Sequence, residues 1–140
     1  MRSADAVIST NDSYRRIAIG RGGISPESVF VVRNGPDLER FRPVQADSAL
    51  RRGRAHLLAY LGMMGPQDGI DQALRALAAL RNLREDDWHA IFIGEGEVRG
   101  EMEGLAVELG VAERVEFTGW RGDDDIRRIL SSADIGIEPD

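Results

Sequence analysis

The sequence contains no cysteine and no lysine, because all 18 of its basic residues are arginine. Without cysteine, the chain can form no disulfide, no thiolate nucleophile and no cysteine-ligated zinc site. Without lysine, it has neither the lysine of a Walker-type phosphate loop nor a lysine that could form a Schiff base or act as a general base. These classes of catalytic and cofactor site are therefore excluded.

Histidine and net positive charge are also scarce. The two histidines, His56 and His89, lie at or next to the start of two different expected strands, far apart in the sequence. Because histidine metal ligands usually come in pairs at helical spacing, we expect no metal site. The formal net charge of −6 argues against nucleic acid or an anionic membrane as a partner, since phosphate groups favour clustered positive charge.

Long hydrophobic runs are missing as well. No segment reaches the roughly 20 apolar residues of a membrane-spanning helix, and the beginning of the sequence lacks the apolar run of a signal peptide. We therefore expect a soluble, cytoplasmic chain with no transmembrane segment. A length of 140 residues with 42% hydrophobic content is sufficient to bury a core.

The clearest pattern lies between residues 55 and 80. An apolar run at residues 57–61 is typical of a strand that is buried on both faces of a parallel sheet. A glycine-rich loop follows at residues 62–69, and residues 70–80 then place apolar side chains at the spacing of an amphipathic helix. Strand, loop and helix form the first half of a βαβ unit, in which the N–H groups at the helix start attract a phosphate.

The rest of the sequence continues the alternation of strands and helices. Further strands are expected at residues 6–9, 29–32, 88–93, 115–117 and 135–137. Further helices are expected from Asn11 or Asp12 onwards, as a single turn at residues 25–27, and at residues 98–109 and 123–132. This alternation predicts a Rossmann-like α/β fold with a parallel sheet that helices cover on both faces.

The first and last expected strands lack neighbours in the pattern. The strand at residues 6–9 has no upstream strand to pair with, and no helix follows the strand at residues 135–137 to cover it. Unpaired strand edges tend to join other chains. We therefore expect association through exposed sheet edges.

The periodicity is lost between residues 37 and 54, in a polar and charged run anchored by Phe41 and Pro43. Such a run is typical of a connector between two structural units. The expected organisation is the end of one α/β domain at residues 1–36, an interdomain linker at residues 37–54, and about the first half of a second α/β domain at residues 55–140.

Several segments occur in the order and spacing of a known family. They read ADAVISTNDSYRR, VFVVRNGPDLERF followed by Pro43, LGMMGPQDG, IFIGEGE, VEFTGW and SSADIGIEPD. The ordered set covers nearly the whole chain and resembles family 4 retaining glycosyltransferases of the GT-B fold. The resemblance implies that residues 1–36 end an N-terminal Rossmann-like domain. It also implies that residues 55–140 form part of a C-terminal Rossmann-like domain that binds a nucleotide sugar.

The resemblance also implies an activity and its ligands. In the family, a sugar passes from a nucleotide-diphosphate donor in the C-terminal domain to an acceptor hydroxyl at the N-terminal domain, without a metal. We therefore expect a nucleotide-sugar donor, an acceptor that the sequence does not identify, no other cofactor, and a role in cell-wall, polysaccharide or glycolipid synthesis.

The family's donor site corresponds to three loops of this sequence. The resemblance places Gly62 and its loop near the diphosphate, Gly94 and Gly96 beside the nucleotide, and the segment from Trp120 to Asp123 beside the base. It places Asn34, Gly35 and Asp37 at the crossover between the domains. The expected donor-binding residues are Gly62, Met63, Gly94, Gly96, Arg121 and Asp123, while no catalytic residue can be named.

Two features depart from the family's pattern. The family loop carries an arginine directly after its first glycine and a lysine just before its last, where this sequence has Met63 and Asp68. Without these cations, the diphosphate would depend on backbone N–H groups and the helix N-terminus. The family's glutamate-bearing segment would follow the strand at residues 135–137, but this sequence does not include it. We therefore expect no transferase activity from the isolated chain.

Some motifs have a structural and a functional interpretation. The GEGEVRG run at Gly94 favours a tight turn over a dinucleotide fingerprint, because its third glycine comes one residue too late. The three acids at residues 123–125 favour a helix start over a metal site, which leaves Asp123 as a candidate base contact. Trp120 could stack on a base or pack at the rim of a cleft. Met63 and Met64 are expected to fill gaps.

Other functions remain as alternatives. A non-catalytic nucleotide-binding or protein-interaction module is the main one, and the departures at Met63 and Asp68 favour it slightly. A sugar-nucleotide epimerase would need acid and base residues that the sequence does not offer.

Overall fold

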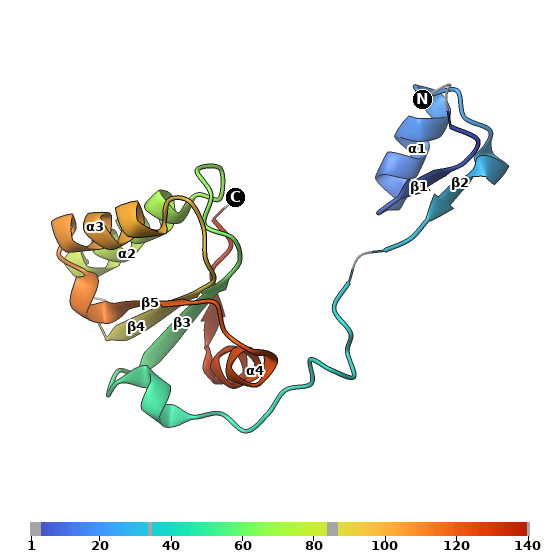
Figure 1. Cartoon of the computed structure of the whole chain (residues 1–140). Helices are drawn as coiled ribbons and strands as arrows, with labels where there is room; N and C mark the ends of the chain where they lie inside the picture. The colour runs from blue at the N-terminus through green and yellow to red at the C-terminus, as the bar shows by residue number, and fades with distance from the viewer. Residues whose placement is uncertain (1–3, 34, 84–86, 140) are drawn as a thin grey trace. The chain divides into compact units, whose positions relative to one another are not determined.

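The computed structural model describes residues 4–33, 35–83 and 87–139. The chain divides into two units, residues 1–40 and residues 41–140 (Figure 1).

The first unit is a parallel pair of strands with one long helix. It consists of β1 (Val7–Ser9), α1 (Asp12–Gly20), the short 3₁₀ helix η1 (Pro26–Ser28) and β2 (Val29–Val31). The side chain of Asn11 accepts a hydrogen bond from the N–H of Tyr14 at 2.9 Å, which confirms the predicted N-cap. The expectation of an unpartnered first strand is wrong, because the crossover through α1 brings β2 beside β1.

The second unit is a four-stranded parallel sheet between helices. Its strands are β3 (His56–Leu61), β4 (Trp88–Ile93), β5 (Val115–Gly119) and β6 (Ile135–Gly136), in the order β5-β4-β3-β6. Its helices are α2 (Ile70–Asn82), α3 (Arg99–Glu108) and α4 (Asp123–Ser132), with the 3₁₀ helices η2 (Ser48–Arg51) and η3 (Ala112–Arg114). Figure 1 shows α2 and α3 over one face of the sheet and α4 over the other. The Rossmann-like arrangement predicted from the sequence is confirmed, with the chain's last strand beside β3.

The alternation of side chains along the central strands produces two cores. Every residue of β4 is buried. On one face, Leu58, Ala90 and Phe92 pack beneath α2 and α3, and the ring of Phe92 lies against the ring of Phe117 with centroids 5.2 Å apart. On the other face, a smaller cluster packs beneath α4 and contains Leu57, Ala59, Ile91, Ile93 and Ile129. Burial on both faces explains why β3 and β4 read as continuous apolar runs.

The segment before β3 packs against α4 within the second unit. We call residues 41–54 the strap. The backbone N–H of Val44 donates to Ser131 Oγ at 3.0 Å, and that of Asp47 donates to Ser132 Oγ at 2.8 Å. The strap includes η2, which the sequence analysis did not predict, because its four residues carry no apolar periodicity.

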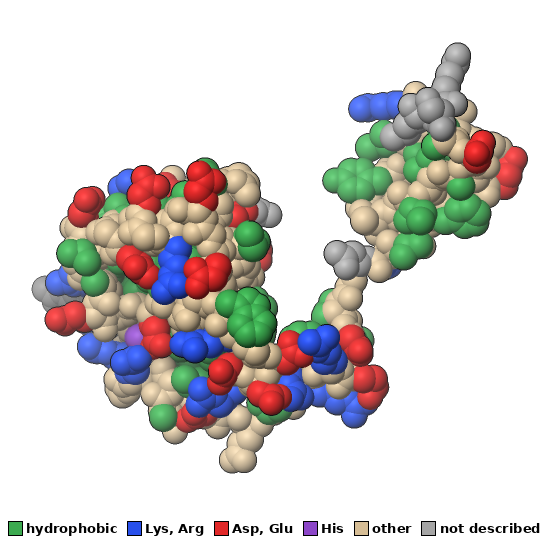
Figure 2. Space-filling view, in the orientation of Figure 1, with side chains coloured by type: hydrophobic (Ala, Val, Ile, Leu, Met, Phe, Trp, Pro, Cys, Tyr) green, Lys and Arg blue, Asp and Glu red, His purple; other side chains and the backbone are tan. Residues whose placement is uncertain are grey.

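The surfaces of the two units differ in character. Figure 2 shows acidic and basic side chains intermixed on the visible face of the second unit, and hydrophobic side chains gathered on that of the first. In the first unit, Ile8 and Phe30 are exposed. Within the described residues, no helix has the length and apolar character needed to cross a membrane.

Candidate functional site

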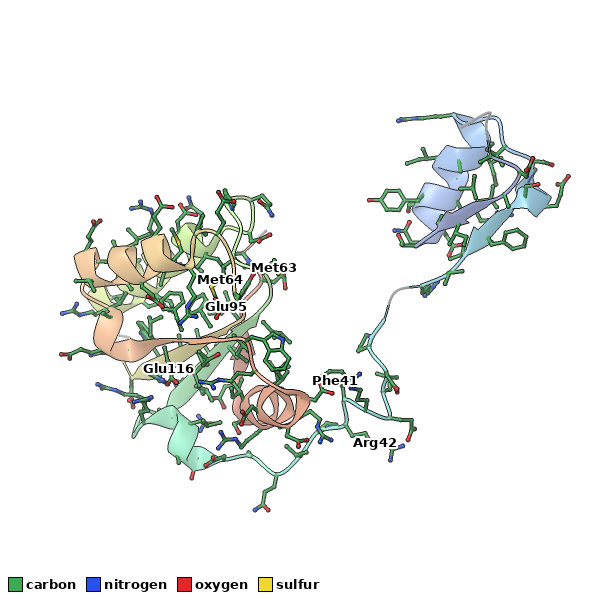
Figure 3. The ribbon with its side chains drawn as sticks, viewed as in Figure 1. Phe41, Arg42, Met63, Met64, Glu95 and Glu116 are labelled. Carbon is green, nitrogen blue, oxygen red and sulfur yellow. The ribbon has the colours of Figure 1, made fainter. Side chains whose placement is uncertain are left out.

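Three loops meet at the carboxyl ends of the parallel strands in the second unit. We call them the carboxyl-end loops: residues 62–69 after β3, residues 94–98 after β4 and residues 120–122 after β5. This edge is where open α/β sheets bind ligands. Figure 3 shows Met63, Met64 and Glu95 together at this end of the sheet.

Backbone hydrogen bonds join the carboxyl-end loops. The N–H of Gly62 donates to the carbonyl of Ile93 at 3.1 Å, and the N–H of Met64 donates to the carbonyl of Glu95 at 3.0 Å. The N–H of Gly94 donates at 3.0 Å to the carbonyl of Gly119, the last residue of β5, which forms an isolated bridge just beyond the end of β4. The loops therefore form one connected surface.

Two of the expected site glycines are required by this close packing. Gly94 has a φ angle of 135°, and a Cβ atom there would collide with the carbonyl oxygen of Gly62. A Cβ atom at Gly96 would collide with the backbone of Met64. Glycine is therefore needed at both positions because the loop after β3 passes directly over them.

Side-chain hydrogen bonds from β3 and from within the loop hold the loop after β3. The hydroxyl of Tyr60 donates to the carbonyl of Met63 at 2.5 Å, and the carboxylate of Asp68 accepts from the N–H of Gly65 at 2.7 Å. The side chain of Met63 is 72% exposed, whereas that of Met64 is fully buried. Met64 therefore fills a gap in the core as expected, while Met63 does not.

The start of α2 offers backbone donors at the same edge. Its N-cap, Gly69, has a φ angle of 62° and contributes no side-chain cap, and the first helical hydrogen bond comes from the N–H of Ala73. The N–H groups of the first turn therefore have no acceptor within the helix. Unsatisfied N–H groups and the positive end of the helix dipole together favour an anion. Gly69 also lies against Pro139, since a Cβ atom there would be 2.5 Å from the carbonyl oxygen of Pro139.

The loop after β5 carries the remaining expected residues. Trp120 is 78% exposed and Arg121 is exposed, whereas Asp123 is half-buried as the first residue of α4. The neighbouring acids pair within the helix, Asp124 with Arg127 and Asp125 with Arg128. Among the described residues, no cluster of His, Asp and Glu could hold a metal ion. The three acids thus have the helix-start positions that the sequence favoured.

The structure therefore groups the predicted donor-binding residues on one edge. Gly62, Met63, Gly94 and Gly96 lie in loops that hydrogen-bond to one another, and Arg121 follows β5 at the same edge. Of the expected crossover residues, Asn34 lies outside the described residues, while Gly35 and Asp37 belong to the first unit. The carboxylate of Asp37 accepts from the N–H of Glu39 at 2.9 Å.

The sequence analysis missed one polar group at this edge. Arg99 donates to Glu95 at 2.6 Å, to Glu103 at 3.0 Å and to the carbonyl of Phe117 at 3.3 Å. The guanidinium thereby connects the loop after β4 to β5. The spacing of four residues between Arg99 and Glu103 was the available signal, because such pairs face one another on a helix.

A family model described as "Glycosyl transferases group 1" matches residues 55–140. The D-inositol 3-phosphate glycosyltransferase of Mycobacterium ulcerans is 33% identical over 145 aligned residues, which cover 97% of this chain and 30% of the relative. The chain thus spans about a third of the length of the curated relatives it matches.

Solved glycosyltransferases share the fold. The crystal structure of WaaG, a glycosyltransferase involved in lipopolysaccharide biosynthesis, superposes with a TM-score of 0.73 at 21% identity, covering 98% of this chain and 38% of that chain. The structure of HepE from Anabaena in complex with UDP superposes with a TM-score of 0.72 at 21% identity, covering 96% and 38%. These likenesses confirm the GT-B type of Rossmann-like fold expected from the sequence.

Proposed function

The chain belongs to the glycosyl transferases of group 1, whose family model covers residues 55–140, and we propose that it is part of an enzyme that transfers a sugar from a nucleotide-diphosphate sugar to an acceptor hydroxyl. The observation that carries this proposal is the connected surface of the carboxyl-end loops, which borders the uncapped start of α2.

The donor diphosphate would bind at the start of α2. The N–H groups of the first turn of α2 and the helix dipole would hold its negative charge. The same donors would stabilise the additional charge that develops on the diphosphate as the bond to the sugar breaks. Gly62 and Met63 would contact the diphosphate through their backbone, in the absence of the two family cations.

The nucleoside would bind across the other two loops. Gly94 and Gly96, which pack against the loop after β3, would border the nucleoside together with Trp120, Arg121 and Asp123 at the same edge. The exposed ring of Trp120 offers an apolar face on which a base could stack. The UDP complex of the HepE structure supports a nucleoside diphosphate as the ligand.

Finer aspects of the activity are also proposed. Retention of the anomeric configuration and a cytoplasmic location stay predictions from the sequence. A role in glycolipid or polysaccharide synthesis is supported by the names of an inositol phosphate glycosyltransferase and a lipopolysaccharide glycosyltransferase among the similar proteins. That the transfer needs no metal also stays a prediction from the resemblance to the family.

A titration of the isotopically labelled 140-residue chain with UDP tests the donor site. We expect saturable shifts of the backbone amides of Gly62, Ile70 and Gly94. Uridine is the matched probe without phosphates, and it should leave the amide of Ile70 unshifted. The absence of a saturable shift with both UDP and GDP would contradict the proposal.

One observation favours the alternative of a non-catalytic nucleotide-binding or protein-interaction module. Asp68 puts a carboxylate at the loop that would hold the diphosphate. If UDP binds only after Met63→Arg and Asp68→Lys restore the family's cations, the native loop is not a donor site and a protein-interaction module is favoured. Release of UDP from UDP-glucose by the 140-residue chain, dependent on an added acceptor, would contradict our expectation that this chain alone is inactive.

A further inference from the structure

A cavity lies at the opposite end of the sheet from the carboxyl-end loops. We call it the amino-end cavity, because His89 and Glu116, which line it, are the second residues of β4 and β5. Its volume of about 540 Å³ lies within the range of small-molecule sites. Figure 3 shows Glu116 well away from Met63, Met64 and Glu95.

His89 reaches this cavity as a buried polar residue without a hydrogen-bond partner for one ring nitrogen. Only 3% of its surface is exposed. Its Nε2 atom has no hydrogen bond within the described part of the chain and lies 3.8 Å from Glu116 Oε2, which is too far for a hydrogen bond. Buried polar atoms are nearly always paired, so this nitrogen requires an explanation.

The protonation state of His89 determines whether Nε2 requires a hydrogen-bond donor or an acceptor as its partner. The backbone of Arg114 hydrogen-bonds the ring, and because Nε2 is unpaired, this bond must come from Nδ1–H to the carbonyl. Burial and the nearby Arg52 guanidinium lower the pKa of His89, which keeps the ring neutral. A neutral ring with a proton on Nδ1 presents only a lone pair at Nε2. The missing partner is therefore a hydrogen-bond donor.

The other polar groups of the amino-end cavity limit the charge of that donor. Arg52 pairs with Glu116, Glu103 pairs with Arg99, and the carboxylate of Glu113 lines the same cavity. An anion would face three carboxylates and a lone pair. An ammonium group beside Nε2 would approach Arg52 and compete with it for Glu116. A neutral hydroxyl avoids both conflicts, because it can donate to Nε2 and accept from Arg52.

The remaining walls are apolar. Ala106 and Val107 of α3 and Val115 and Phe117 of β5 contribute the apolar part of the lining. A sugar combines hydroxyl groups on its edge with C–H groups on its ring faces, so it matches walls of both kinds.

Arg52 holds a left-handed backbone conformation with a φ of 50°, which is uncommon for a residue other than glycine. Its guanidinium is directed onto Glu116.

We propose that the amino-end cavity binds a neutral carbohydrate, with one sugar hydroxyl donating to His89 Nε2 and another contacting Glu116. This site is separate from the carboxyl-end loops, and it does not depend on the proposed transferase activity.

The test is a titration of the labelled 140-residue chain, followed through the ring nitrogens of His89. The probes are methyl α-D-glucopyranoside, methyl α-D-mannopyranoside and myo-inositol, with butylammonium and sulfate as charged comparisons. We expect a saturable shift of Nε2 with at least one sugar or the cyclitol and none with the charged probes. Glu116→Gln should weaken this binding about three- to tenfold, the loss expected for one hydrogen bond.

Glu101→Gln is the matched control, because Glu101 lies on α3 but not in the amino-end cavity. Its affinity for the probe should equal that of the unmodified chain, and thermal melts should show all proteins folded. Equal shifts with butylammonium, no saturable shift with any of the three neutral probes, or equal affinities of the two variants would each overturn the proposal. If none of the three neutral probes gives a saturable shift, an ordered water remains as the partner of His89.

Discussion

The carboxylate of Asp68 accepts a hydrogen bond from the backbone N–H of Gly65 at 2.7 Å, within the loop that leads into α2. A negative charge therefore stabilises the loop at the position where the family that this sequence resembles has a lysine. The charge and the hydrogen bond can be separated by mutation, because asparagine keeps the acceptor oxygen and removes the charge.

Asp68→Asn should strengthen UDP binding. Removal of one negative charge near the start of α2 should lower the Kd about three- to tenfold at low salt, because a diphosphate would no longer be repelled. Isothermal titration calorimetry gives the measurement, with Glu113→Gln at the other end of the sheet as the control for net charge. Unchanged or weaker binding by Asp68→Asn would show that the diphosphate does not lie near this loop.

Gly94→Ala should destabilise the second unit by about 2 kcal/mol or more, because the new Cβ meets the Gly62 carbonyl and the φ angle is unfavourable for alanine. Gly104→Ala is the matched control. It lies in α3 with open space around its Cβ position, so the substitution should raise stability by about 0.5–1 kcal/mol. Urea unfolding followed by circular dichroism measures both, and similar values for the two variants would contradict the argument.

Ser132→Ala should loosen the strap. Ser132 is buried, and its hydroxyl accepts from the N–H of Asp47 at 2.8 Å and donates to the carbonyl of Arg128 at 2.7 Å. Loss of this hydroxyl leaves the N–H of Asp47 without that acceptor, at a cost of about 1–2 kcal/mol.

Hydrogen exchange at the Asp47 amide should report the change directly. The exposed Ser48 provides the control substitution Ser48→Ala, which should leave exchange at Asp47 nearly unchanged. Unaltered exchange in Ser132→Ala would mean that the strap is held by other contacts.

Asp134 should contribute to the acid sensitivity of the second unit. Hydrogen bonds from Arg51, and then from the N–H of Leu57, lower the pKa of Asp134 from 3.8 to about 2. Because the folded-state pKa is depressed, this contribution is complete above the ordinary value and is lost as the pH falls towards 2.

Thermal melts between pH 7 and pH 2 test this. Asp134→Asn should lower the Tm at neutral pH, and its difference from the unmodified chain should shrink below the ordinary pKa of 3.8. Asp124→Asn is the control, because the Asp124 side chain is highly exposed beside Arg127 and contributes little. A difference between the Asp134→Asn and unmodified chains that stays constant down to pH 2 would argue against the ion pair.

The sequence predicted the fold well where the signal is local. The apolar runs of β3 and β4 and the amphipathic pattern of α2 depend on residues that are close in sequence. The helix α4 was predicted with its observed bounds, Asp123–Ser132, because acids mark its start.

The sequence did not predict features that depend on long-range contacts. The bond between Asp47 and Ser132 joins residues 85 positions apart, and no periodicity reports it. No periodicity reports the contact of Gly94 with Gly62 either. This contact explains why residue 94 is a glycine, whereas the sequence indicated only that it belongs to a turn. His89 was considered as a metal ligand and set aside, because no second histidine lies at helical spacing. Its neighbours Arg52 and Glu116 come from other parts of the chain, so the local sequence could not report them. The assignment of donor-binding roles to individual residues stays a prediction.

The strap also changes where the folding unit begins. The family match starts at residue 55, but Val44, Asp47 and Arg51 contribute backbone and side-chain partners to α4 and to the residues after it. A recombinant fragment cut at residue 55 would leave Ser132 and Asp134 without these partners and expose the surface that the strap covers. A fragment that starts at Phe41 should express as the more soluble and protease-resistant protein.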